Sequence, residues 1–219
     1  MDKVFQRAQA ALVSFNRFFV EDIKTALGNE ELVKEFENKL AEYGSTIYES
    51  YLKRREELSS TLQNKSLKRG LEKLLNRIDK RIRCYGKEDI EPSLPVITLE
   101  CVIGAQLEKS ILDAVYNHIK AGDYSRVRKV ISYLSSRGIY KKIVEAFSHI
   151  FLYELGGYIP DILEETRNID KTIKKIDKAY QYASKYIREA IENLFYNKEE
   201  DFLNKIEYGI QLEKYYREK

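Results

Sequence analysis

A heptad pattern near the carboxyl end constrains this chain more than any other feature of its sequence. Ten positions follow one another in alternating steps of four and three residues, and most of them are aliphatic. Such spacing places all of the side chains on one face of an α-helix. We therefore predict one long helix over residues 161–196, on the order of 50 Å in length at about 1.5 Å per residue. The ten positions are Ile162, Thr166, Ile169, Ile173, Ile176, Tyr180, Ala183, Ile187, Ala190 and Leu194.

The rest of the chain also shows helical spacing, with apolar residues recurring at threes and fours and not alternating. The pattern predicts an all-α fold, a multi-helix bundle of about eight or nine helices. The segment 85–95 contains a Gly and two Pro residues, which are typical of a linker. We expect an N-terminal helical group over residues 1–84, this linker, and a C-terminal helical bundle over residues 96–219.

The composition is that of a soluble globular protein. Of 219 residues, 43% are hydrophobic and 33% are charged, and the net charge of +3 is too small to indicate a polyanion binder by itself. Charged residues interrupt the most apolar stretch, and the amino terminus lacks a secretory signal pattern, so we expect a cytoplasmic protein without a membrane partner. The 17 Tyr residues, the absence of Trp and the high charge content resemble heat-adapted proteins.

Positive charge is concentrated in one helix. Between Lys65 and Arg83 the sequence contains eight basic and two acidic residues. Five of the basic residues fall on the side of the helix opposite a leucine stripe, and we call them the basic ridge: Arg69, Lys73, Arg77, Lys80 and Arg83. A row of cations on one face predicts contacts with the phosphate backbone of DNA or RNA. The alternative is a solvated helix face without a partner.

The heptad face offers a second kind of binding surface. Ile169, Ile173, Ile176 and Tyr180 would form a seam with a second copy of the chain or with another protein. A homodimer and a protein–protein adaptor or assembly subunit are therefore alternatives, as is a central helix inside one bundle. Nearby, Tyr180, Tyr182 and Tyr186 lie among Lys178, Lys185 and Arg188, an interleaving that suits base stacking or a protein partner.

Catalytic motifs are missing from the sequence. Neither His118 nor His149 belongs to a recognised metal motif, although Glu145 and His149 would share a helix face. The glycines do not form a phosphate-binding loop, so we expect no nucleotide cofactor. We predict a non-enzymatic interaction protein with no metal and no other cofactor, and we keep a carboxylate/histidine metal enzyme as the second alternative.

One short segment has a familiar pattern. The run KAGDYSRVRKVISYLSSRG, residues 120–138, resembles the turn between helices in tetratricopeptide-type hairpins, and its AGDYSR portion resembles a turn in the translin family. The resemblance covers fewer than twenty residues and does not recur at a fixed period. It implies a helical hairpin at this point and assigns no functional residue.

Overall fold

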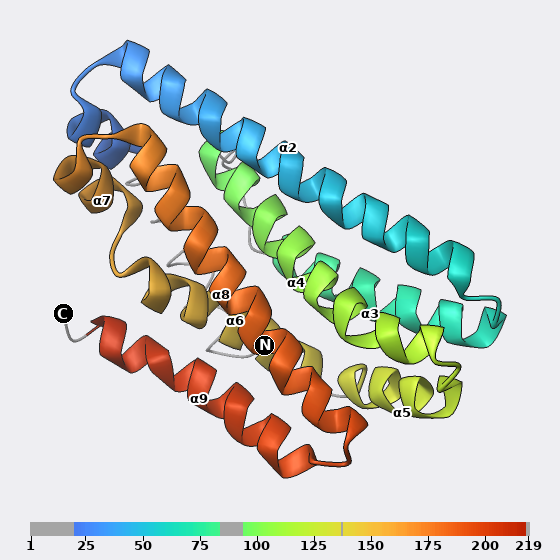
Figure 1. Ribbon diagram of the computed structural model, residues 1–219. Helices are drawn as coiled ribbons and strands as arrows, with labels where there is room; N and C mark the ends of the chain where they lie inside the picture. Colours follow the sequence, from blue (N-terminus) through green and yellow to red (C-terminus); the bar gives the residue numbers. More distant parts are fainter. Residues whose placement is uncertain (1–19, 84–93, 137, 218–219) are drawn as a thin grey trace.

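The structure, a computed structural model, describes residues 20–83, 94–136 and 138–217 (Figure 1). Every regular element in these ranges is a helix, which confirms the all-α bundle, and the helix count agrees with the prediction. Residues 20–27 are helical as well. The helices are α2 (Glu30–Thr61), α3 (Lys65–Arg83), α4 (Leu94–Lys120), α5 (Tyr124–Leu134), α6 (Ile139–Leu155), α7 (Ile159–Thr166), α8 (Ile169–Phe195) and α9 (Glu199–Arg217).

Helix α8 is the central element of the bundle. It packs against α4, α6 and α9, while α2 lies along α4 as an outer helix (Figure 1). On the other side of α4, α3 packs against α5 and α6. The buried residues of all these helices form one hydrophobic core. No helix in the described ranges is both long enough and apolar enough to cross a membrane.

The N-terminal and C-terminal helical groups proposed from the sequence share this one core. Helices α2 and α3, which belong to the N-terminal group, pack directly on α4 of the C-terminal group. Of the proposed linker 85–95, only Leu94 and Pro95 are described, and they begin α4, where proline is well tolerated because the first helical N–H groups have no partner. Residues 1–19 and 84–93 lie outside the described ranges.

The single helix predicted over residues 161–196 is wrong, because two helices occupy this range. Arg167 adopts a left-handed conformation with φ of 45°, and Asn168 is extended with φ of −148°. The side chain of Asn168 accepts the backbone N–H of Lys171 at 2.9 Å and so caps α8. The heptad spacing continues through this break because core residues lie on both sides of it, Ile162 in α7 and Ile169 in α8.

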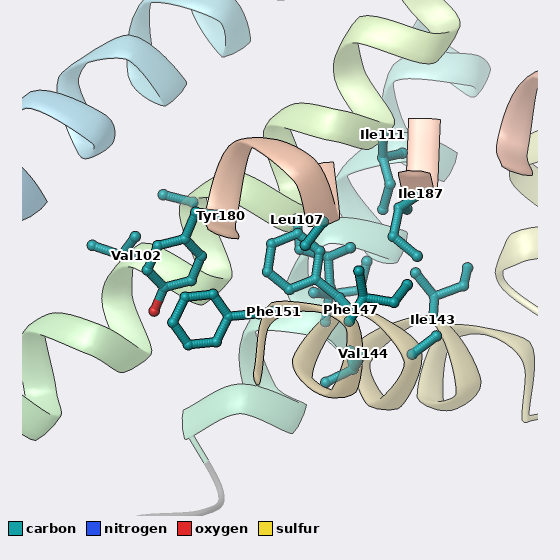
Figure 2. Packing of buried hydrophobic residues seen from close by; sticks show 14 of the residues in the cluster. Val102, Leu107, Ile111, Ile143, Val144, Phe147, Phe151, Tyr180 and Ile187 are labelled. Carbon is teal, nitrogen blue, oxygen red and sulfur yellow. The ribbon is translucent and has the colours of Figure 1, made fainter. Parts of the chain in front are cut away.

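The heptad face packs inside the chain. Ile176 and Tyr180 are 0% exposed, Ile169 is buried, and Ile173 packs against the core. The Tyr180 ring stacks on that of Phe151 in α6, with 3.9 Å between the ring centroids and 17° between the planes (Figure 2). A partner would have to displace α4 and α6 to reach this seam. The pattern therefore marks the central helix of a bundle.

Gly209 allows α9 to cross α6 closely. A Cβ atom at this buried position would lie 2.9 Å from Cδ1 of Ile150 and 3.2 Å from Cβ of Ala146. The end of the Ile150 side chain can rotate away, whereas Cβ of Ala146 is fixed to the backbone of α6. The absence of a side chain at residue 209 therefore sets the separation of the two helices.

We expect Gly209→Leu to lower the free energy of unfolding by about 2–3 kcal/mol, because the larger side chain forces α9 away from α6. Urea unfolding followed by circular dichroism measures this change. Asn204→Leu, on the exposed side of α9, is the matched control and should leave the midpoint nearly unchanged. An unchanged midpoint for Gly209→Leu would contradict the close crossing.

Candidate nucleic-acid interface

Helix α3 is amphipathic, with one apolar face and one basic face. The side chain of Asn64 accepts the backbone N–H of Leu67 at 3.1 Å and begins the helix. The leucine stripe is buried against the core: Leu67, Leu71, Leu74, Leu75 and Ile78. Burial of this stripe leaves the opposite side of α3 in solvent.

The structure places three residues of the basic ridge on that solvent face. Arg69, Lys73 and Arg77 are exposed. Lys80 and Arg83 belong to the last turns of α3, but their side chains lie outside what the structure describes. The exposed residues recur every four positions, so they follow one line along the helix.

Helix α5 runs beside α3 and turns part of the ridge into a groove. This α3–α5 groove has a volume of about 280 Å³. Its floor is apolar, since Leu67 and Ile131 are buried, and Gly70 adds no side chain between the helices. The lining residues are Ser66, Leu67, Gly70, Lys73, Arg77, Arg128, Ile131, Ser132 and Ser135.

The polar lining of the groove consists of cations and hydroxyl groups. Lys73, Arg77 and Arg128 form no ion pair with any carboxylate in the described ranges, and no acidic residue lines the groove. Nη1 of Arg77 donates a hydrogen bond to the backbone carbonyl of Ser135 at 2.6 Å, which holds the guanidinium at the groove. Guanidinium, ammonium and hydroxyl groups are the donors that phosphate oxygens accept from.

Sequence reasoning missed the contribution of α5. Arg128 and Lys129 are exposed on this helix, and Val127, Val130 and Ile131 are buried, so its amphipathic pattern was readable. The pairing of α5 with α3 was not readable, because helical periodicity shows which face is buried and not which helix covers it. The structure joins Arg128 to Lys73 and Arg77, and it leaves Arg69 on the ridge outside the groove lining.

The two histidines lie apart, on α4 and α6, in separate surroundings. The ring of His118 stacks on that of Phe195 at 3.7 Å, and its Nε2 lies 3.8 Å from a carboxylate oxygen of Glu192. Nδ1 of His149 lies 2.9 Å from the backbone carbonyl of Ile210. In the described part of the chain, no three His, Cys, Asp or Glu side chains are grouped to hold a metal ion. The structure therefore adds no support to the metal-enzyme alternative.

Comparison with known proteins gives no match: no family model, no curated protein and no solved structure is detectably similar to this sequence. The fold and the groove define the chain as an all-α bundle with a basic groove between two helices.

Proposed function

We propose that this protein binds the phosphate backbone of nucleic acid through the α3–α5 groove and the adjoining basic ridge, without catalysing a reaction. The observation that carries the proposal is that Lys73, Arg77 and Arg128 line one groove, and that no carboxylate among the described residues lines it with them. An amphipathic helix that is merely solvated usually mixes acidic and basic residues at four-residue spacing. Here two helices of different sequence present the same sign of charge to each other.

The size of the surface suits a polyanion. From Arg69 to Arg77, the described part of the ridge extends about 12 Å at 1.5 Å per residue. Several phosphate groups of a nucleic acid strand fit along this length, since duplex DNA carries one negative charge per about 1.7 Å of its axis. Contacts with phosphate groups carry no base information, so we expect similar affinity for strands of different sequence.

The adaptor alternative loses its original basis. Its proposed seam, which includes Ile176 and Tyr180, is part of the core. A homodimer through the same residues would require the bundle to open. We therefore favour nucleic acid over a coiled-coil partner as the ligand class.

The test is a binding titration of labelled DNA and RNA, single-stranded and double-stranded, between about 50 mM and about 200 mM salt. We expect affinity to fall steeply with salt. In the double variant Lys73→Gln/Arg128→Gln, the slope of log K against log salt should become shallower by about 2, one for each lost phosphate contact. Affinity at the lowest salt should fall about tenfold or more.

The matched control is Lys24→Gln/Lys34→Gln, which removes the same charge from two exposed residues, one in the helical segment 20–27 and one near the start of α2. These two segments lie at the end of the bundle away from α5 (Figure 1). This variant should retain both the affinity and the salt slope. Equal losses of affinity in the two variants would show that net charge, and not the groove, determines the binding. Absence of binding at the lowest salt would identify the groove as a solvated surface and overturn the proposal.

A further inference from the structure

The solvent face of α8 carries a second row of positive charge. Lys171, Lys174, Lys178 and Lys185 are exposed and lie within about 60° of one another on the helix, opposite the buried heptad face. We call these four residues the α8 lysine stripe. It extends about 21 Å. Helix α8 runs across the front of the molecule in Figure 1, with α9 beside it.

An exposed aromatic cluster adjoins the stripe. Tyr182 lies among the lysines of α8 and is 47% exposed, while Tyr153 of α6 and Tyr208 of α9 are 46% and 56% exposed. The three helices pack against one another. The pKa of Tyr182 is raised, first by partial burial and then by the charges of Glu154, Tyr208 and other neighbours that include Tyr153. Interior contacts bring the three segments together, since the ring of Phe151 stacks on that of Tyr180 at 3.9 Å and Nδ1 of His149 lies 2.9 Å from the backbone carbonyl of Ile210. The three exposed tyrosines each lie two residues from one of these contacts, and we call them the tyrosine platform.

A fourth tyrosine fixes the position of α9 next to α8. The hydroxyl of Tyr186 donates to the backbone carbonyl of Lys205 at 2.9 Å. Nζ of Lys205 lies 5.2 Å from the centroid of the Tyr186 ring and 3.1 Å from a carboxylate oxygen of Glu189. These contacts link the two helices at the level of the platform, so its rings are presented on a rigid support.

Charges of both signs lie at this surface, since Glu154 and Glu189 act on Tyr182 and the lysine stripe follows α8. The carboxylate of Glu189 is neutralised by Lys205 and by Lys185, whose Nζ lies 3.9 Å away. Lys171, Lys174 and Lys178 make no ion pair within the described residues. Unpaired lysines along a helix attract a polyanion, whereas a protein partner would need a specific array of carboxylates to match them.

We propose that the tyrosine platform and the α8 lysine stripe bind single-stranded nucleic acid, with bases stacked on the exposed rings and phosphates along the lysines. Single strands are favoured because their bases are free to stack on a protein ring, whereas the bases of a duplex are already stacked on each other. This inference rests on the proposed function, since both assign nucleic acid as the ligand, but it uses different residues and a different recognition chemistry.

The experiment compares three labelled probes: an oligothymidine strand, an abasic strand of equal length, and a duplex. The wild-type protein should bind the oligothymidine strand more tightly than the abasic strand. In Tyr182→Ala/Tyr208→Ala, affinity for oligothymidine should fall about tenfold per lost ring, and affinity for the abasic strand should be unchanged. Tyr182→Phe/Tyr208→Phe keeps both rings and is the matched control, with nearly wild-type affinity expected.

A second variant tests the stripe independently of the rings. Lys174→Glu/Lys178→Glu should weaken binding of oligothymidine and of the abasic strand alike, because it acts on phosphates. Circular dichroism verifies that each variant retains its helices, which we expect because all four side chains are exposed.

The outcomes separate the two proposals. Equal wild-type affinity for oligothymidine and the abasic strand, or an alanine variant that binds oligothymidine like wild type, overturns the base-stacking inference and reassigns the platform to a protein partner. If the groove variant Lys73→Gln/Arg128→Gln still weakens binding in that case, the proposed function stands. Absence of wild-type binding to every probe at low salt overturns both.

Discussion

The Ile176→Asp variant is expected to lose at least about 4 kcal/mol of unfolding free energy and to be largely unfolded at room temperature. Ile176 is 0% exposed on the inner face of α8, which packs against both α4 and α6. An aspartate here would place a carboxylate in an apolar core. Its charge is costly to desolvate, and protonation of the carboxylate offsets only part of that cost.

The measurement is urea unfolding at two protein concentrations at least tenfold apart. Because Ile176 belongs to the core of a single chain, we expect the loss of stability at both concentrations and no folded species of smaller size. Lys174→Glu, two residues away on the exposed side of α8, is the control and should change stability by about 0.5 kcal/mol or less.

A different result would show that the heptad face is an interface between two chains. In that case Ile176→Asp would yield a folded monomer, and the unfolding midpoint of the wild-type protein would depend on its concentration. The variant therefore distinguishes two interpretations that the heptad pattern leaves equivalent, since both bury the same side chains.

Periodicity was sufficient to predict the fold class and the buried faces of α3 and α8. The leucine stripe of α3 and the heptad face of α8 are buried as expected. The break at Arg167 and Asn168 was not predicted, because the core spacing on its two sides stays in register. Asn is a strong helix-capping residue, so Asn168 was the sequence signal for the start of a new helix, and its side chain accepts the backbone N–H of Lys171. The uninterrupted heptad spacing hid this signal.

Contacts between distant segments were beyond the reach of periodicity. The sequence grouped Tyr180 with Tyr182 and Tyr186 because they are close in the chain, yet Tyr180 is in the core and Tyr182 is exposed. Two residues along a helix correspond to about 200° of rotation, which separates these two rings. The neighbours that complete the platform, Tyr153 and Tyr208, come from α6 and α9. In the same way, α5 supplies Arg128 to a site predicted on α3 alone.

Burial of several tyrosines should make the protein sensitive to alkaline pH. Tyr180 is fully buried and its pKa is raised well above the usual value, mainly by desolvation. Desolvation is also the main cause of the raised pKa of Tyr43 and Tyr51, with further contributions from Asp177 and Glu108 respectively. The same cause raises the pKa of Tyr186 to about 12.

The direction of the pH effect follows from proton counting. Above pH 10 these phenols lose their protons in the unfolded chain but keep them in the native state, so the native state binds more protons and stability falls as pH rises. Each such tyrosine lowers the free energy of unfolding by about 1.4 kcal/mol per pH unit. Four together give a slope of about 5–6 kcal/mol per unit, which is comparable with the whole stability of a domain.

We therefore expect that tyrosine ionisation does not affect the free energy of unfolding below pH 10. About one pH unit above this value, the protein should unfold cooperatively. Circular dichroism follows helix loss, and ultraviolet absorbance follows tyrosinate formation. The buried phenols should ionise in the same narrow pH interval in which the helices are lost. Tyr186→Phe removes one of these phenols and should reduce the slope of stability against pH by about 1.4 kcal/mol per pH unit. Gradual ionisation of all tyrosines while the helices persist would contradict the burial of these phenols, because a native state that tolerates tyrosinate has no reason to unfold at that pH.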